Sequence, residues 1–189
     1  MKRVVVTALT LSLVLVLAGC SAFINGFKEG LEQQTGSSTD GVQVVSSDVS
    51  SLSMEFPDSW RTYELNENSS IQMAHLVREQ YFAVIEESGI DFDDNFTIEN
   101  YASAILSSML IVVDTTEKPQ IMDAIINGID VKQFELSGSF EGIRVTYLIT
   151  FANTNGMFYQ FIAWTLQSRY ETAKPVFEGI LESMSFQAL

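Results

Sequence analysis

His75 is the single histidine in the 189-residue chain, and imidazole is the side chain best suited to acid–base chemistry at neutral pH. A hydrolase built on it would need a serine or cysteine nucleophile beside it and a carboxylate to orient it. No G-x-S-x-G motif is present. His75 alternates with Ile71, Met73 and Val77, so it shares one face of a predicted strand with apolar side chains. We therefore expect a core or half-buried histidine, with a hydrolase centred on His75 as the disfavoured alternative.

Asp91, Asp93 and Asp94 form the densest group of potential metal ligands, and Glu86 and Glu87 precede them. Calcium needs several oxygen ligands that converge, and the twelve-residue loop of an EF-hand with its central glycine is absent. Negative charge is also favourable in a loop that leads into a helix N-terminus. We expect a solvated acidic loop and no cofactor, with a low-affinity calcium site at the three aspartates as the alternative.

Cys20 is the single cysteine, which excludes an internal disulfide framework. It ends a leader in which Lys2 and Arg3 precede an uncharged run from Val4 to Leu17. A membrane-spanning helix needs about 20 apolar residues, so this run fits the apolar part of a secretory signal peptide better than a transmembrane segment.

The sequence Leu17-Ala18-Gly19-Cys20 resembles the lipobox of bacterial lipoproteins. The resemblance implies that a diacylglycerol is attached to the thiol of Cys20 and that residues 1–19 are removed. It also implies a membrane anchor on the extracytoplasmic face. Ser21 lacks the acidic character that usually retains Gram-negative lipoproteins at the inner membrane, and the type of cell envelope stays open.

Charge and composition exclude one class of partner. The chain has 10 Lys and Arg against 24 Asp and Glu, a formal net charge of −14. Such a surface repels phosphate backbones, so we expect no nucleic-acid binding. It also repels anionic lipid headgroups, so the folded body should stand off the membrane. Hydrophobic residues make up 47%, which is ample for a core.

Residues 20–51 are predicted to be a tether, because the stretch before Leu52 is rich in Ser, Gly and Asp. A coil of this kind has a root-mean-square reach of roughly 30 Å over thirty residues. Helical spacing of apolar residues leaves a short amphipathic turn as the alternative to a flexible linker near the start of the tether, at Phe23, Ile24, Phe27 and Leu31. A short edge strand could interrupt the later part at Val42, Val44 and Val45.

Residues 52–189 are predicted to form one domain of strands and two helices. Asn127-Gly128 is a strong two-residue hairpin signal, and turns at 137–142 and 153–156 join the following strands. We expect the strand at 60–65 to pair with that at 52–56, and 143–152 and 157–166 to lie at the sheet centre. The predicted strands are 52–56, 60–65, 71–77, 81–85, 121–126, 129–136, 143–152 and 157–166.

Two segments show helical periodicity. Thr97 is a predicted N-cap for a helix with a continuous apolar stripe, and Leu106 and Leu110 on its other side predict deep packing. In the second helix Pro175 is expected in the first turn. Together the elements predict an α+β fold, an antiparallel sheet flanked by helices. The stripes are Ile98, Tyr101, Ala102, Ile105, Met109 and Val112, and Val176, Phe177, Ile180, Leu181 and Met184.

Several short motifs resemble the PsbP/Mog-type fold. They are FPDSW at 56–60, TIENYA at 97–102, ING at 126–128 and PVFEGILESMSF at 175–186. That family includes photosystem II extrinsic subunits, a Ran-binding import factor and bacterial lipoproteins of unassigned role. The resemblance implies an antiparallel sheet sandwiched by helices, and it transfers no catalytic or binding residue.

The favoured hypothesis is a lipid-anchored, non-catalytic module that binds an envelope protein or supports assembly of an envelope complex. A lipoprotein that binds a small ligand or cation is the second hypothesis, and a hydrolase using His75 is the third. A pocket between the aromatic strands and the central helix would favour the second, whereas a filled interface would favour the first. Tyr147 and Tyr159 are the aromatic candidates for lining an open groove.

Overall fold

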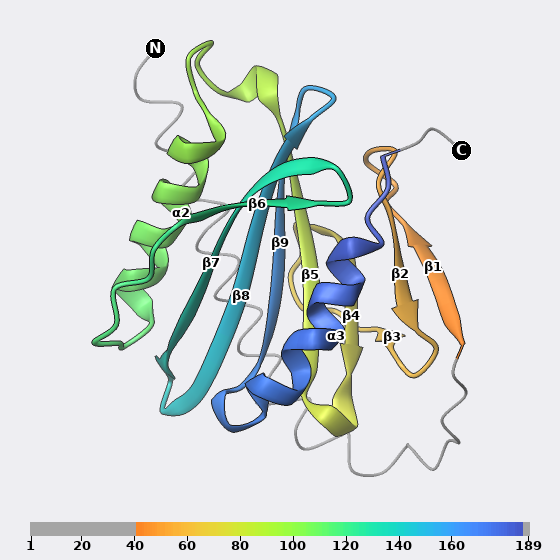
Figure 1. Cartoon of the computed structure of the whole chain (residues 1–189), viewed down its shortest axis with the longest axis vertical. Helices are drawn as coiled ribbons and strands as arrows, with labels where there is room; N and C mark the ends of the chain where they lie inside the picture. Colours follow the sequence, from red (N-terminus) through yellow and green to blue (C-terminus); the bar gives the residue numbers. More distant parts are fainter. Residues whose placement is uncertain (1–40, 187–189) are drawn as a thin grey trace.

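The computed structural model describes residues 41–186, and they form an antiparallel sheet with a helix on each face (Figure 1). Helix α2 spans Ile98–Val112, and α3 spans Tyr170–Glu182. The strands are β1 (Val42–Ser46), β2 (Ser53–Pro57), β3 (Arg61–Thr62), β4 (Ser69–His75), β5 (Gln80–Ser88), β6 (Met122–Ile126), β7 (Ile129–Phe140), β8 (Ile143–Thr154) and β9 (Met157–Leu166).

The main sheet has seven strands in the order β3-β4-β5-β9-β8-β7-β6, and every neighbouring pair is antiparallel. The predicted α+β class is therefore confirmed, and β9 lies at the centre as expected. Two-residue turns join the last four strands. Asn127-Gly128 and Asn155-Gly156 both have positive φ at each position, as a type I′ hairpin requires.

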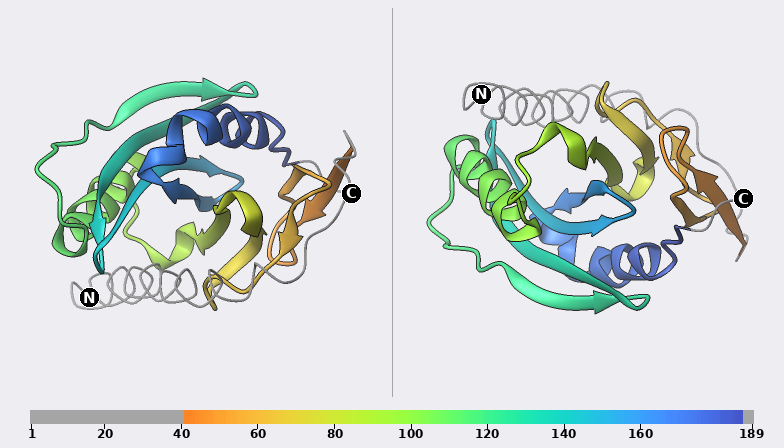
Figure 2. Two further views of the ribbon diagram at one scale, coloured as in Figure 1. Left: turned by 90° about the horizontal axis from the view of Figure 1, so that it is seen from below. Right: turned by 90° about the horizontal axis from the view of Figure 1, so that it is seen from above.

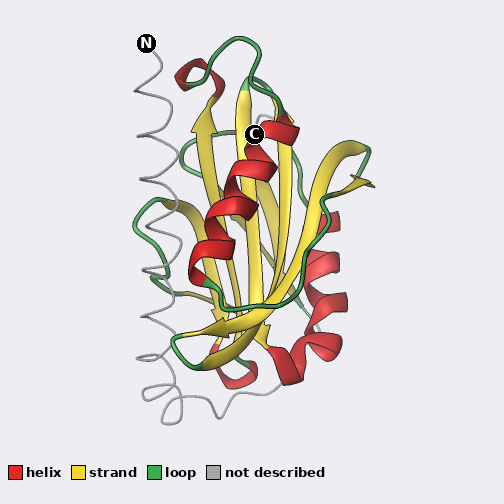
Figure 3. Ribbon diagram, turned by 90° about the vertical axis from the view of Figure 1, so that its left-hand side faces the viewer, coloured by secondary structure: helices red, strands yellow, loops and turns green. Residues whose placement is uncertain are grey.

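Each face of the sheet has its own hydrophobic core. Viewed along the strands, α2 lies on one side of the sheet and α3 on the other (Figure 2), and Figure 3 shows the sheet between them. The α2 face contains Tyr101, Phe134 and Ile162 among its buried residues. The α3 face is also covered by the β1–β2 hairpin, and it buries Trp60 and Phe177.

Helix α2 begins with a capping box. The side chain of Thr97 accepts a hydrogen bond from the Asn100 N–H, and the Asn100 side chain accepts one from the Thr97 N–H. These bonds satisfy backbone donors that the first turn leaves free. The predicted deep packing of the second side is wrong for Leu110, which is 42% exposed, whereas Leu106 is half-buried against the core. Only the face toward β7 and β8 is covered, so the opposite side meets solvent.

Helix α3 buries a single stripe, as its periodicity predicted. Ala173, Phe177, Ile180 and Leu181 are buried. Pro175 lies inside the helix instead of in its first turn, because α3 begins at Tyr170, five residues earlier. Its exposed position leaves room for the ring on the solvent side.

The strands at the N-terminal end differ most from the prediction. β3 covers only Arg61–Thr62 and pairs with β4, not with β2. The side chain of Gln72 explains its early end, since its Oε1 accepts hydrogen bonds from the N–H groups of Leu65 (2.7 Å) and Asn66 (3.0 Å). These two donors are therefore not available to a longer ladder.

β2 instead pairs with β1, in a register that places Val42 opposite Pro57 and Ser46 opposite Ser53. β1 is the edge strand that Val42, Val44 and Val45 allowed. It extends the folded body N-terminally of Leu52, where the sequence placed the start of the domain.

We expect Thr97→Ala to lower the free energy of unfolding by about 1 kcal/mol, because it removes the N-cap side chain of α2. Urea denaturation followed by circular dichroism measures this difference. Ser107→Ala is the matched control, because it also removes one hydroxyl from the helix but leaves the cap intact. An equal loss in both variants would contradict the assigned role of the cap.

Candidate binding site

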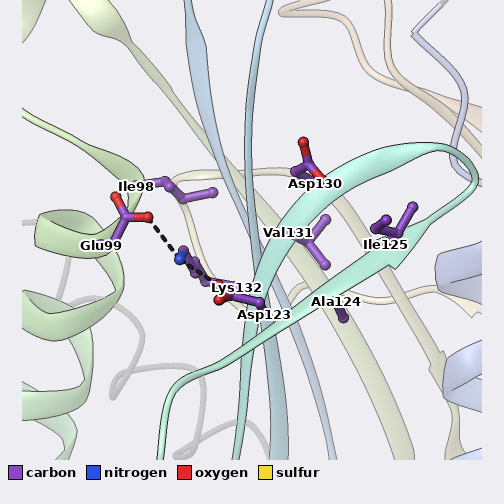
Figure 4. A pocket seen from close by; sticks show the side chains of 8 residues that line it. All are labelled: Ile98, Glu99, Asp123, Ala124, Ile125, Asp130, Val131 and Lys132. Carbon is purple, nitrogen blue, oxygen red and sulfur yellow. Dashed lines mark hydrogen bonds and ion pairs between the residues drawn. The ribbon is translucent and has the colours of Figure 1, made fainter.

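An open cleft of about 510 Å³ lies between the N-terminus of α2 and the β6–β7 hairpin (Figure 4). It combines apolar side chains with four charged ones, so it can contact both parts of an amphipathic ligand. The lining residues are Ile98, Glu99, Asp123, Ala124, Ile125, Asp130, Val131 and Lys132.

Lys132 lies in the middle of this cleft, between two carboxylates. Its Nζ is 2.7 Å from Oε1 of Glu99 on α2. The same ammonium forms an ion pair with Oδ1 of Asp123 on β6. The side chain of Lys132 is only 18% exposed, whereas those of Glu99 and Asp123 are 57% and 83% exposed. The ammonium thus joins the helix to the edge of the sheet.

Local structure determines how these three residues meet. The two-residue turn pairs Ile126 with Ile129, and this register places Asp123 directly opposite Lys132. Glu99 is the second residue of α2, where a negative side chain interacts favourably with the helix dipole. None of these three residues is predicted as a site residue by its sequence pattern.

The ion pair between Glu99 and Lys132 keeps both groups charged near neutral pH. The hydrogen bond from Lys132 is the main cause that lowers the pKa of Glu99 to about 2. Hydrogen bonds to Asp123 and Glu99 raise the pKa of Lys132 in turn. An ammonium held in its charged form is neither a base nor a nucleophile. Glu99 and Lys132 therefore supply fixed charges and take no part in proton transfer.

A second hollow, of about 360 Å³, lies at the other end of β7, where the chain leaves α2. Asp114 and Ser139 exchange backbone hydrogen bonds of 2.9 Å there, and Gly138 lets the two segments approach closely. The side chain of Arg144 donates from Nε to Oε1 of Gln167 at 2.7 Å. This hollow is polar, and its arginine is already engaged by a neighbouring side chain.

His75 is half-buried at the end of β4, as expected, while Ile71 and Met73 beside it are buried. Val77 is not on that face, because residues 76–78 form a 3-10 turn and Val77 is 54% exposed. Nδ1 of His75 accepts a hydrogen bond from the Arg78 N–H at 3.3 Å. Burial, followed by the Arg78 charge, lowers the pKa of His75. Within residues 41–186 the imidazole forms no hydrogen bond to a serine hydroxyl or a carboxylate, so no nucleophile–base pair is assembled there.

The three loop aspartates are exposed. Asp91 ends a 3-10 turn, and Asp93 and Asp94 precede α2. In the described part of the chain, no three His, Cys, Asp or Glu side chains are grouped so that they could hold a metal ion.

The other candidates from the sequence also have definite places. Tyr147 and Tyr159 are 2% and 0% exposed, so they belong to the two cores and line no open groove. Cys20 and the leader lie outside the described residues. Among residues 41–186, no helix has both the length and the apolar character needed to cross a membrane.

Solved structures of other proteins share this arrangement. CyanoP, the cyanobacterial PsbP from Synechocystis sp. PCC 6803, matches with a TM-score of 0.58 and 13% identity, over 84% of this chain and 99% of that chain. The fold is PsbP/Mog1-like. LpqN, involved in cell envelope biogenesis of Mycobacterium tuberculosis, matches with a TM-score of 0.55 and 13% identity, over 78% and 91%. The Ran-binding protein Mog1p of Saccharomyces cerevisiae matches with a TM-score of 0.53 and 6% identity, over 78% and 96%.

The PsbP/Mog1-like fold confirms the architecture that the short motifs implied. At identities of 6 to 13% the likeness establishes the fold alone. The sequence matches no family model and no curated protein.

The ion pair in the cleft predicts a specific loss of stability in acid. The pKa of Glu99 lies below its ordinary value of 4.5, so its contribution is present above pH 4.5 and is lost as the pH falls toward 2. We expect Glu99→Gln to remove this component and to flatten the stability profile between pH 4.5 and 2. The effect should be modest, since exposed ion pairs are screened by solvent. Denaturant midpoints at several pH values measure it.

Glu117→Gln is the control for this titration, because Glu117 is an exposed glutamate without an ion pair in the described part of the chain. Its profile should keep the slope of the unsubstituted protein. If Glu99→Gln keeps that slope too, the ion pair between Lys132 and Glu99 does not contribute to stability in solution.

Proposed function

We propose that this chain is a non-catalytic binding or assembly module that a lipid on Cys20 holds at the extracytoplasmic face of a membrane, where it engages a protein partner. The observation that carries the binding role is the open cleft around Lys132, which combines an ion-paired ammonium with partly apolar walls. Such a surface recognises shape and charge and offers no activated nucleophile.

The packing of the sheet favours a protein partner over an enclosed small ligand. The space between α2 and the sheet is filled by aromatic rings. The ring of Tyr101 lies 5.5 Å from that of Phe151 and 5.2 Å from that of Phe158, and all three side chains are buried. The candidate cleft lies outside this interface and is open to solvent. An open, mixed surface of this kind is typical of a docking site.

Two further observations support the location and the kind of role. The leader that ends in Leu17-Ala18-Gly19-Cys20 has the charge, length and small residues of a lipoprotein signal. Among the proteins that share the fold, LpqN is involved in cell envelope biogenesis and Mog1p binds Ran. Both descriptions fit a scaffold used for binding or assembly.

The anchor is tested on the full-length chain produced in bacterial cells. We expect mass spectrometry to find a diacylglycerol on the Cys20 thiol and residues 1–19 removed. Cys20→Ala should keep the leader and carry no lipid, because the acceptor sulfur is missing. Ser21→Ala is the matched control and should be processed normally. An unmodified Cys20 thiol in a chain that still has its leader would overturn the proposed location.

The partner is tested by crosslinking in intact cells, followed by pull-down of the full-length lipidated protein and of Cys20→Ala. We expect a protein that is enriched with the lipidated form and is recovered several-fold less with the variant. Equal recovery would show that the anchor does not place the module at its target. Recovery of no specific protein in either case would overturn the partner-binding role.

A further inference from the structure

The outer edge of β6 is an unpaired sheet edge in the described structure. β6 is the last strand of the sheet and pairs only with β7. Within residues 41–186, no backbone–backbone hydrogen bond outside that ladder involves residues 122–126. A free strand edge presents N–H and C=O groups that another extended chain can pair with.

The turn geometry identifies which backbone groups face outward. In a two-residue hairpin the residues that flank the turn, here Ile126 and Ile129, form a hydrogen-bonded pair. Hydrogen-bonded and non-hydrogen-bonded pairs then alternate along an antiparallel ladder. Asp123 and Ile125 therefore occupy non-hydrogen-bonded positions, and their N–H and C=O groups point away from β7. The side chains of the same two residues line the cleft.

Apolar side chains on this edge are exposed on both faces. Ile125 is 73% exposed on the cleft side, and Met122, on the opposite face of the strand, is 64% exposed. Proteins usually protect a free edge with charge, proline or a covering segment. Large apolar side chains at such an edge are typical of an interaction surface.

The charge of the cleft indicates which kind of partner would bind at the β6 edge. The cleft contains three carboxylates, those of Glu99, Asp123 and Asp130, against the single ammonium of Lys132. Lys132 is shared by Glu99 and Asp123, and Asp130 takes part in no ion pair within the part of the chain that the structure describes. A second copy of this chain would bring another acidic cleft and a further net charge of −14 to the same edge. Charge complementarity therefore favours a basic partner.

We propose that the free edge of β6 binds an extended segment of a partner protein in which basic and apolar residues alternate. The segment pairs with the outward groups of Asp123 and Ile125 and adds one strand to the sheet. Its basic side chains lie on the cleft side, with their aliphatic stems along Ile125 and one charged end beside Asp130. Its apolar side chains lie on the face of Met122. This inference rests on the proposed function and adds to it the surface and the chemistry of the partner.

The probe is a synthetic peptide of alternating Lys and Val residues, added to the full-length protein in detergent. Hydrogen–deuterium exchange should show at least about tenfold slower exchange at the amides of Asp123 and Ile125 when the peptide is bound. β1 is an internal control, because it is also an edge and exposes Val42 and Val44 at 60% and 66%. Its exchange should not change. A peptide with Glu in place of Lys should protect neither strand.

Two pairs of variants test the backbone and the charge separately. Ile125→Pro removes an outward N–H and leaves the β6–β7 ladder intact, so peptide affinity should fall at least about tenfold. Ile125→Ala keeps the backbone N–H, so its loss of peptide affinity should be smaller. Asp130→Lys should also weaken binding at least about tenfold. Glu141→Lys makes the same charge change in the exposed β7–β8 turn and should alter affinity less than about twofold.

Thermal melting checks that each variant folds. If Ile125→Pro does not fold, the comparison of Asp130→Lys with Glu141→Lys tests the docking site instead. Equal protection of β1 and β6, or equal affinity of Asp130→Lys and the unsubstituted protein, would overturn the docking site. That outcome leaves the proposed function standing, provided that the lipid and an enriched partner are found. An unlipidated Cys20 with intact peptide binding would overturn the proposed location alone.

Discussion

Strand β9 is buried on both of its faces, and the rest of the architecture follows from this constraint. All residues from Phe158 to Thr165 are buried, although successive side chains point to opposite sides. Phe161 contributes to the core under α3, and Ile162 contributes to the core under α2. Since each buried Å² of apolar surface contributes about 25 cal/mol, neither face can be left to solvent. The two helices and the β1–β2 hairpin supply the two covering layers.

This double cover ends before the last strand, and the candidate site lies where it ends. β6 has no fully buried residue, whereas β7 beside it buries Val131, Phe134 and Leu136. The first turn of α2 reaches this part of the hairpin, where Glu99 contacts Lys132. The tip of the hairpin is held from the other side, because Nδ2 of Asn127 donates to the Met184 carbonyl at 2.8 Å. A strand that is fixed at its tip and unpaired along its outer edge presents a preformed edge.

Local sequence patterns predict most of the fold. Alternation and the Asn-Gly turns locate the strands from β6 to β9, and the stripe that includes Ile105 and Met109 locates the buried face of α2. The predictions failed where a distant side chain decides the outcome. Gln72 ends β3 by taking the backbone donors of Leu65 and Asn66, and no pattern within residues 60–65 reports that contact.

Only part of the candidate site could be predicted from the sequence. A two-residue turn at Asn127-Gly128 already implies that Asp123 lies opposite Lys132, because the register of a hairpin follows from its turn. The contribution of Glu99 could not be predicted, since it depends on how α2 packs against β7. The exposed apolar edge of β6 could not be predicted from the sequence either. Ile125 and Ile126 look alike in the sequence, and only the tertiary structure shows that Ile125 is exposed while Ile126 packs against the α3-face core.

The bridge between Ser53 and Ser185 ties the first hairpin of the body to its last residues through two backbone hydrogen bonds of 2.9 Å. Gly41 lies one five-residue strand away from that point, a separation of roughly 17 Å. A linker of about six extended residues would span it. The body can therefore be closed between Phe186 and Gly41 and reopened at the exposed Glu141-Gly142 turn without breaking any sheet pairing. The sandwich therefore does not depend on the order in which its segments occur along the polypeptide.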